Sequence, residues 1–401
     1  MISKKFLISI ILLIIVGIVG GFLILRKQSV DNANNDKSTS GKATTEMYPQ
    51  NSSWQMFHGN QALSGVADGK LPEKFRLVWK FETDDAIKSS AVAKEGRVFI
   101  GSDDGNVYAI SLEKGEKVWS FQTGDTVEAP PCIVDNSVFI GSSDTYLYAL
   151  DTEDGELQWK YKTGGKILGS VNWTVSPNGD TIYVLVGSYD NEMHCVNYLT
   201  GKAVWTYEVG NYINGAPAVI DSKIVFGNCD GIIYLVSTID GKEIAAIEVG
   251  SYIAGSPAIK GKYAYVGNYD GQIVCADLEK NQTLWRYENE SFPFFSSPAV
   301  SENRVVCGSR DKKLHCLDRE TGNLEWTFQT LDNVDSSPVI CGDKVVVGSD
   351  DGRLYVINLS DGKEIWSYEI GESITSSPAI INGMIIVGAE DGYVYAFGGI
   401  L

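Results

Sequence analysis

Few residues in this sequence have the types and spacing that redox, metal or acid–base chemistry needs. Its seven cysteines include no C-x-x-C pair and no two neighbours, which argues against a zinc site and a dense disulfide framework. Among its three histidines, His194 and His315 fall in one slot of a repeated segment, where Tyr108 and Tyr148 stand in other copies, and His58 lies apart. Because a catalytic site needs groups that converge within hydrogen-bond reach, we predict no catalytic residue, no cofactor-binding residue and no metal site.

Residues suited to binding are more concentrated. Aromatic side chains gather in the short loops that precede three consecutive repeats, and two acidic residues hold related loop positions elsewhere. The predicted partner-binding residues are Tyr212, Tyr252, Phe292, Phe294, Phe295, Glu128, Asp335 and Trp173. Aromatic rings beside polar groups at a concave surface favour a peptide or carbohydrate ligand; the alternative is that the rings only fill a channel. Trp173 lies in the one sizeable insertion, either as a stacking residue or as a filler of the enlarged loop.

These loops belong to a repeat, marked by a glycine that recurs every 40 or so residues, roughly one supersecondary unit. The repeat glycines are Gly101, Gly141, Gly187, Gly227, Gly267, Gly308, Gly348 and Gly388. Apolar alternation with a period of two, together with turn pairs such as Asp154-Gly155, is typical of β-hairpins and not of helices. A period of this length with three or four short strands per copy predicts an all-β, eight-bladed β-propeller, one blade per copy.

A second series places tryptophan at one slot of the outer strand. The slot holds Trp79, Trp119, Trp159, Trp205, Ala245, Trp285, Trp326 and Trp366. A tryptophan there is expected to dock on the next blade and bury a large apolar surface, so Ala245 predicts a weak joint. The last copy lacks its outer strand, whereas the segment 77–81 is a surplus strand ahead of the first copy. We predict that 77–81 completes the last blade and closes the ring, which removes an open sheet edge.

The beginning of the chain differs from the repeats. The run Phe6–Leu25 carries no charge and is long enough to span a bilayer as a helix. We predict a membrane anchor over 1–27, a flexible polar linker over 28–53 and the propeller over 54–401. The alternative is a cleaved secretory signal, whose apolar region is usually shorter and ends at small residues. With so short a leading tail, we predict a single-pass cell-membrane protein whose propeller lies on the extracytoplasmic side.

The charge of the chain excludes one class of ligand. With 33 Lys and Arg against 51 Asp and Glu, the formal net charge is −18. DNA and RNA are therefore not expected partners, because their binding depends on cations that neutralise phosphates. The simplest role of the charge is solubility, and the alternative is steering of basic partners.

Cys307 and Cys316 fall on neighbouring strands of the sixth repeat. Counting back from the hairpin turn between them places the two residues opposite each other, with Cβ atoms about 5 Å apart. Outside the cytoplasm such a pair could form a cross-strand disulfide. The alternative is two buried free thiols, since a disulfide needs a Cβ separation nearer about 3.8 Å.

The segment 149–159, with the pattern A-x-D-x-x-x-G-x-x-x-W, resembles the tryptophan-docking repeat of the pyrroloquinoline-quinone-like (PQQ-like) propellers. Similar segments end at Trp205, Trp326 and Trp366, and the resemblance covers residues 54–401. That family includes quinoprotein dehydrogenases and non-catalytic platforms similar to the propeller lipoprotein of the bacterial outer-membrane barrel-assembly machine. The resemblance therefore implies the fold and leaves the function to the individual site.

The two classes in that family differ in their chemistry. Quinoprotein dehydrogenases use a stacking tryptophan, a disulfide between adjacent cysteines, a calcium ion and an aspartate base, whereas this chain has no adjacent cysteines and mostly minimal blades. By resemblance we predict a membrane-anchored, non-catalytic scaffold that binds protein or glycan partners outside the cytoplasm and needs no cofactor. The alternatives are a PQQ-dependent oxidoreductase and a structural component of a surface layer.

Overall fold

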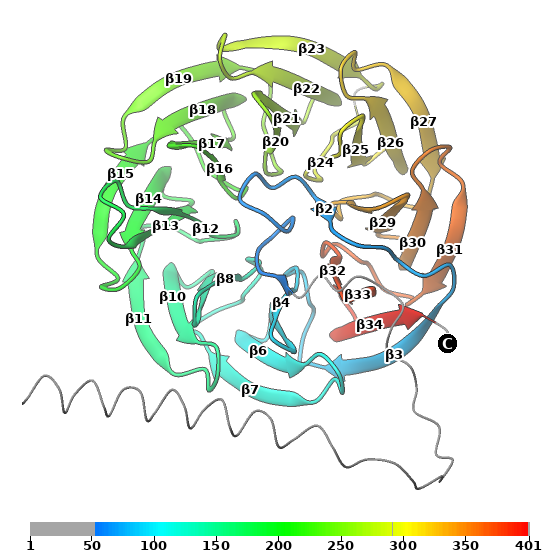
Figure 1. Ribbon diagram of the computed structural model, residues 1–401, viewed down its shortest axis with the longest axis horizontal. Helices are drawn as coiled ribbons and strands as arrows, with labels where there is room; N and C mark the ends of the chain where they lie inside the picture. Colours follow the sequence, from blue (N-terminus) through cyan, green and yellow to red (C-terminus); the bar gives the residue numbers. More distant parts are fainter. Residues whose placement is uncertain (1–52, 291, 400–401) are drawn as a thin grey trace, which may run out of the picture. The chain divides into compact units, whose positions relative to one another are not determined.

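The computed structural model describes residues 53–290 and 292–399, which form eight sheets arranged around one axis (Figure 1). The prediction of an all-β, eight-bladed propeller is confirmed. Within the described residues, no helix is long and apolar enough to cross a membrane. The predicted anchor over 1–27, and all but the last residue of the predicted linker over 28–53, lie outside the described residues.

Each blade contains four strands, which are named in order from the axis outward. The first four blades comprise β4 (Val92–Lys94), β5 (Arg97–Gly101), β6 (Asn106–Ser111) and β7 (Lys117–Gln122); β8 (Cys132–Val134), β9 (Ser137–Gly141), β10 (Tyr146–Asp151) and β11 (Leu157–Lys162); β12 (Asn172–Val175), β13 (Ile182–Gly187), β14 (Glu192–Asn197) and β15 (Ala203–Glu208); and β16 (Ala218–Ile220), β17 (Lys223–Gly227), β18 (Ile232–Ser237) and β19 (Glu243–Glu248). The last four comprise β20 (Ala258–Lys260), β21 (Tyr263–Gly267), β22 (Gln272–Asp277) and β23 (Gln282–Glu288); β24 (Ala299–Val300), β25 (Arg304–Ser309), β26 (Lys313–Asp318) and β27 (Leu324–Gln329); β28 (Val339–Cys341), β29 (Lys344–Gly348), β30 (Arg353–Asn358) and β31 (Glu364–Glu369); and β32 (Ala379–Ile381), β33 (Met384–Gly388), β34 (Tyr393–Gly399) and β3 (Phe75–Glu82).

The two faces of the ring follow from this antiparallel order. The loops that lead into the innermost strands share one face with the turns between the second and third strands of each blade, and we call it the tip face. The eighth blade takes its outer strand from the beginning of the described chain, because β3 pairs with β34 and sets Trp79 opposite Ala396. This is the segment that the sequence assigns to ring closure.

Residues 53–67, which we call the strap, cross the axis at the other face of the ring (Figure 1). The strap begins as β1 (Ser53–Trp54), which pairs with β4, and ends as β2 (Val66–Ala67), which pairs with β28. Between them its carbonyl oxygens accept hydrogen bonds from the innermost strands; for example, Ile133 donates to Gln55 and Ile259 donates to Ala62, at 2.7 and 2.8 Å. The strap thus satisfies inner edges that would otherwise carry unpaired buried N–H groups. We call this side the strap face.

Each repeat glycine forms a socket for an apolar side chain of the next blade. A Cβ atom at Gly141 would lie 2.1 Å from Ile167, and one at Gly388 would lie 2.3 Å from Ile87, which joins the eighth blade to the first. We call the three residues centred on each socket residue, in the loop that leads into an innermost strand, a loop tip; in the first blade it is 86–88. The socket residues are Ile87, Val127, Ile167, Ile213, Ile253, Phe294, Val334 and Ile374. All are buried, so the period of the sequence reports a packing contact that only a residue without a side chain permits.

The tryptophan series makes the outer joints between blades. The indole of Trp119 donates to the Thr152 carbonyl at 3.1 Å, and its ring covers Gly155, where a Cβ would lie 2.7 Å away. Equivalent contacts are made by Trp79, Trp159, Trp205, Trp285 and Trp326. At the joint where the series breaks, Ala245 replaces tryptophan and the glycine position is Asn281, so both halves of the contact change together.

The placement of Cys307 opposite Cys316 is wrong, and with it the cross-strand disulfide. The hairpin turn is centred on Asp311, so Cys307 faces His315 and Cys316 faces Val306. A shift of one residue turns a side chain to the other face of a sheet. Cys307 therefore packs between the fifth and sixth blades and Cys316 between the sixth and seventh, both as free thiols.

The broken joint predicts a stabilising pair of substitutions. We expect Ala245→Trp together with Asn281→Gly to raise the free energy of unfolding by about 1–2 kcal/mol, because a docked indole buries a large apolar surface. Ala245→Trp alone should stabilise less or destabilise, since the Asn281 side chain occupies the space over which the ring would lie. Urea unfolding of the two variants and of the wild type measures this, and equal stabilities would contradict the role assigned to the joint.

The strap contains a buried histidine that should make folding pH-dependent. Burial of His58 lowers its pKa from 6.5 to about 4, against the effect of a hydrogen bond to the Leu63 carbonyl. As the pH falls, the unfolded chain therefore binds this proton before the folded chain does. The free energy of unfolding is unaffected by His58 above pH 6.5 and decreases as the pH falls towards 4, by roughly 3 kcal/mol in total. His58→Asn, which tolerates the positive φ of 56° and does not titrate, should flatten this part of a stability profile measured between pH 4 and 7.

Candidate functional site

The tip face is built from eight equivalent pairs of positions. In each blade the N–H two residues after the repeat glycine donates to the first residue of a loop tip, as Asp103 donates to Ala86 at 2.9 Å. This bond places the third tip residue near the residue that follows the glycine by two. Taken in order, the pairs are Lys88 and Asp103, Glu128 and Ser143, Leu168 and Tyr189, Asn214 and Cys229, Ala254 and Tyr269, Phe295 and Arg310, Asp335 and Asp350, and Thr375 and Glu390.

Two groups of aromatic rings lie on one side of this face. Tyr212 stacks on Tyr189 with ring centres 4.8 Å apart and planes at 5°. Farther along, Tyr252 and Tyr269 lie 6.0 Å apart, and both pack edge-on against Phe295. Tyr212 and Tyr269 are 47% and 52% exposed. We call these five residues the aromatic arc; it spans the third to the sixth blade, and its exposed rings are those of Tyr212 and Tyr269.

Not all the aromatic residues predicted to bind partners lie on the surface of the tip face. Phe294 is not a surface residue, because it fills the socket under Gly267 and is only 1% exposed. Phe292 is exposed but lies against the Gly271 turn. Tyr189 and Tyr269 were missed, although both stand two residues after a repeat glycine. Comparing that slot between copies would have found them.

Acidic residues gather on the other side of the tip face. Asp335 binds the Arg310 guanidinium with both carboxylate oxygens, at 3.0 and 2.6 Å, while that guanidinium lies 3.8 Å over the ring of Phe295. Burial, together with the charge of Asp335, raises the pKa of Asp350 to about 6. One carboxylate oxygen of Asp350 and one of Asp103 are buried without a hydrogen-bond partner among the described residues.

Trp173 does not belong to this site. It lies on β12, where its carbonyl oxygen accepts a hydrogen bond from Gln61 of the strap at 2.6 Å. Its side chain is partly buried against the core between the second and third blades. The structure therefore separates Trp173 from the tip-face residues with which it was predicted.

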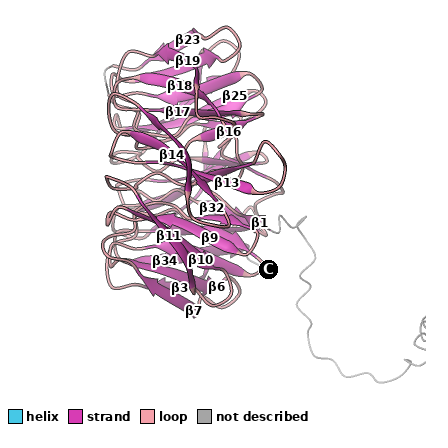
Figure 2. Cartoon of the chain, turned by 90° about the vertical axis from the view of Figure 1, so that its left-hand side faces the viewer, coloured by secondary structure: helices cyan, strands magenta, loops and turns pink. Residues whose placement is uncertain are grey.

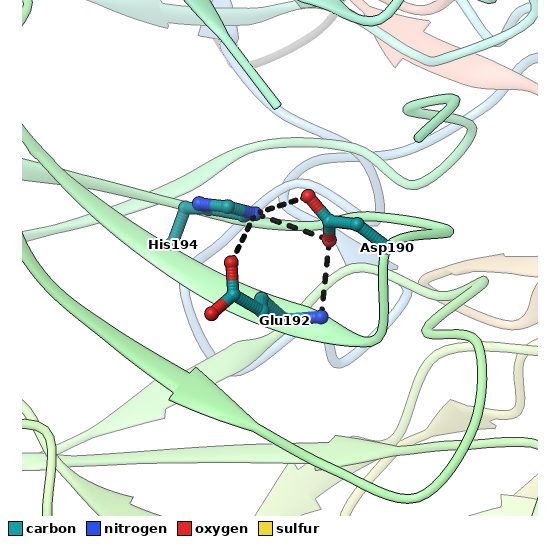
Figure 3. Close-up of side chains that lie close together, drawn as sticks. All are labelled: Asp190, Glu192 and His194. Carbon is teal, nitrogen blue, oxygen red and sulfur yellow. Dashed lines mark hydrogen bonds and ion pairs between the residues drawn. The ribbon is translucent and has the colours of Figure 1, made fainter. Parts of the chain in front are cut away.

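The third blade contains a group that could be taken for a metal site. His194 lies 3.1 Å from Asp190 and 3.9 Å from Glu192 (Figure 3). Although burial opposes ionisation, hydrogen bonds from His194 and from the Gly164 N–H lower the pKa of Asp190 to about 2. The carboxylate is therefore charged and already has donors, one of them from the preceding blade. Asp190 thus joins the third blade to the loop that follows the second blade, and this structural role accounts for the group.

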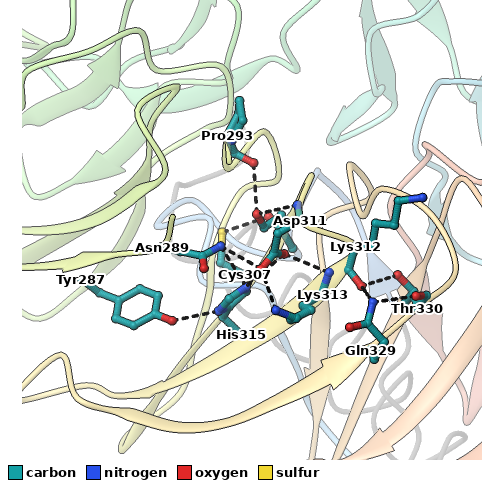
Figure 4. Close-up of polar contacts among 12 residues, drawn as sticks. Tyr287, Asn289, Pro293, Cys307, Asp311, Lys312, Lys313, His315, Gln329 and Thr330 are labelled. Carbon is teal, nitrogen blue, oxygen red and sulfur yellow. Dashed lines mark hydrogen bonds and ion pairs between the residues drawn. The ribbon is translucent and has the colours of Figure 1, made fainter. Parts of the chain in front are cut away.

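The same hydrogen bond to a turn aspartate, which we call a tie, recurs in other blades with either histidine or tyrosine as its donor. In the sixth blade His315 binds Asp311 at 3.0 Å (Figure 4). In other blades a tyrosine hydroxyl replaces the imidazole, as in the bond from Tyr108 to Asp104 at 2.6 Å. The expectation that His194 and His315 share a slot with tyrosines is confirmed, and the slot has a common role.

Comparisons with known proteins agree on the fold. A family model described as outer membrane protein assembly factor BamB matches residues 76–211, 162–244 and 229–399. Among solved structures, BamB from Moraxella catarrhalis has a TM-score of 0.69 and 21% identity, over 81% of this chain and 98% of that chain. The computationally designed Ika8 protein has a TM-score of 0.71 and 18% identity, over 80% and 99%.

A europium-containing methanol dehydrogenase is also similar, with a TM-score of 0.70 and 13% identity, over 86% of this chain and 98% of that chain. No curated protein matches the chain. At these identities the similar structures show the fold alone, because propellers of one architecture host unrelated functions.

The structural role of the histidine ties can be tested by exchange. His194→Tyr should unfold at nearly the wild-type urea concentration, because a tyrosine hydroxyl binds the equivalent aspartate in other blades. His194→Phe should cost about 1–3 kcal/mol, since Asp190 loses a partner in a half-buried position. A metal site would behave differently: stabilisation of the wild type by zinc, abolished in both variants, would contradict the structural role.

Proposed function

Because the chain belongs to the family of the outer membrane protein assembly factor BamB, we propose that it is a non-catalytic platform that binds partner proteins on its tip face. The carrying observation is the exposed aromatic arc. Tyrosine rings give large contact areas with little loss of side-chain freedom, and they are enriched at the centres of protein interfaces. The arc uses positions that hold no aromatic residue in the first, second, seventh and eighth blades, so it is a departure from the repeat and not a requirement of the fold.

The tip face does not fit pyrroloquinoline quinone. That cofactor is a polycarboxylate and needs several cations. The two basic residues at the paired tip positions are already engaged, Lys88 by Asp103 and Arg310 by Asp335. Among the described loop tips this leaves one exposed lysine, Lys166, without an ion pair. The unpaired carboxylate oxygens nearby would repel the cofactor. The stacked pair of Tyr189 and Tyr212 also leaves no slot between its rings for a planar ligand. The methanol dehydrogenase likeness thus extends to the fold and not to these residues.

The proposal includes a location. The uncharged run Phe6–Leu25 supports a single membrane-spanning helix, followed by a polar linker long enough to hold the propeller away from the bilayer. Because long domains that follow such a helix translocate largely regardless of their charge, this favours a propeller on the extracytoplasmic side of the cell membrane. Protease treatment of intact cells tests it: digestion of the propeller in intact cells supports this side, and protection until lysis contradicts it.

The binding role of the aromatic arc is tested by capture from intact membranes. We expect the full-length protein to retain a defined partner, and Tyr212→Ala with Tyr269→Ala to weaken that binding about tenfold or more, because exposed aromatic anchors dominate interface energies. Leu284→Ala on the outer strand β23 removes a comparable exposed apolar side chain and serves as the matched control.

Four outcomes would contradict the platform proposal. Partner binding could be unchanged in the Tyr212→Ala and Tyr269→Ala variant, or it could be lost equally in the Leu284→Ala control. Reduction of a redox dye after incubation with pyrroloquinoline quinone and calcium would instead indicate an oxidoreductase. Loss of the captured partner after enzymatic removal of glycans would identify a glycan ligand in place of a protein.

A further inference from the structure

Two exposed apolar residues lie on the strap face, at a repeated position that is acidic in most other blades. In the seven blades whose third and fourth strands are joined by a turn, one residue of that turn follows the position whose carbonyl accepts a tryptophan indole in six of them. This position holds Glu113, Glu153, Leu199, Ile239, Glu279, Glu320 and Ser360. Leu199 and Ile239 are 68% and 54% exposed, on the neighbouring third and fourth blades. The exposure is therefore a local replacement of acidic residues by apolar ones.

The insertion of the third blade lies beside these two residues. The hairpin between β12 and β13 extends from the side of the ring on which β1 lies (Figure 2), and Val175 at its base is 54% exposed. A cavity of about 490 Å³ on one side of the hairpin is lined by Val175, Val219 and Ile239. A second of about 350 Å³ on the other side is lined by Val175, Tyr198 and Leu199. Val175 lines both cavities, with Ile239 in one and Leu199 in the other; we call Val175, Leu199 and Ile239 the apolar notch.

The charged residues that line the two cavities have one sign. Among the described residues that line the two cavities, Asp135, Asp180 and Asp221 are the only charged ones. Asp180 accepts a hydrogen bond from Ser176 at the insertion, which keeps its carboxylate at the rim. An occupant must therefore offer apolar side chains to the notch and positive charge to its border.

We propose that the apolar notch is a second docking surface, for an amphipathic segment of a partner protein whose apolar anchors are flanked by lysine or arginine. The surface lies on the opposite face from the aromatic arc and goes beyond the tip-face platform. A second copy of this chain would bring acidic rims together, and an anionic lipid surface would meet the same repulsion, so charge complementarity selects a basic segment.

The probe for this surface is a fluorescein-labelled peptide that repeats Leu-Lys-Lys-Leu-Leu-Lys-Leu, with a control peptide in which glutamate replaces lysine. We expect the full-length protein to bind the first peptide and not the second. Leu199→Glu with Ile239→Glu should weaken binding about tenfold or more, as loss of anchors does. These substitutions install the residue that other blades carry, so the fold tolerates them, and their added negative charge would by itself strengthen attraction to the peptide.

Matched variants separate the notch from general attraction. Leu331→Glu changes a residue that is 72% exposed on the tip face and should leave peptide binding intact. Asp180→Asn with Asp221→Asn should weaken binding and reduce its dependence on salt. Tyr212→Ala with Tyr269→Ala should bind the peptide normally, while Leu199→Glu with Ile239→Glu should keep the tip-face partner, so the two surfaces succeed or fail separately.

Unchanged peptide affinity in the Leu199→Glu and Ile239→Glu variant would overturn the proposal, as would an equal loss in the Leu331→Glu control. The proposal also fails if the same substitutions leave peptide binding unchanged but abolish self-association in sedimentation or attachment to phosphatidylcholine vesicles, because the occupant would then be a second copy or a lipid surface.

Discussion

The contact between a repeat glycine and an apolar side chain of the next blade is the constraint on which the rest of the structure depends. It occurs at all eight joints, including the one from Gly388 to Ile87 that closes the ring. Tryptophan docking fixes the outer edge, and side-chain hydrogen bonds such as the one from the Ser256 N–H to Ser297 fix several joints near the axis. Contacts at several distances from the axis leave a blade little freedom to tilt, because close-packed interiors resist changes of even one methylene.

Because the socket contacts hold neighbouring blades together, the residue types beside each socket residue can vary from blade to blade. The socket residue of a loop tip is buried, whereas the residues on either side reach the tip face and take no part in the joint. In consecutive blades these positions can therefore carry aromatic rings, as at Tyr212 and Tyr252, and in other blades they carry acids, as at Glu128 and Asp335. The same separation allows Leu199 and Ile239 to replace glutamates on the strap face without a change in the blades that carry them.

Hydrogen bonds to the aspartates of the hairpin turns orient the turns beside these apolar contacts. The aspartate of a hairpin turn accepts a bond from a tyrosine or histidine of its own blade and, at Asp144, one from the Gly124 N–H of the preceding loop at 2.7 Å. Half-buried carboxylates with such donors have hydrogen-bond partners, so they orient the turns without offering reactive groups. The chemistry available to partners thus lies outside the ties, on the exposed rings and the unpaired acids.

The amino-acid sequence by itself determined the number of blades, the order of the joints and the strand that closes the ring, because each of these depends on a residue type that recurs at a fixed period. It did not determine which way neighbouring side chains point. Phe294 and Phe295 are adjacent, yet one fills a socket and the other joins the aromatic arc, and Cys307 misses Cys316 by a one-residue shift in the turn. Only the tertiary structure decided these, because a side chain's direction depends on which of two adjacent residues enters a socket and on the length of each turn, and residue type alone distinguishes neither.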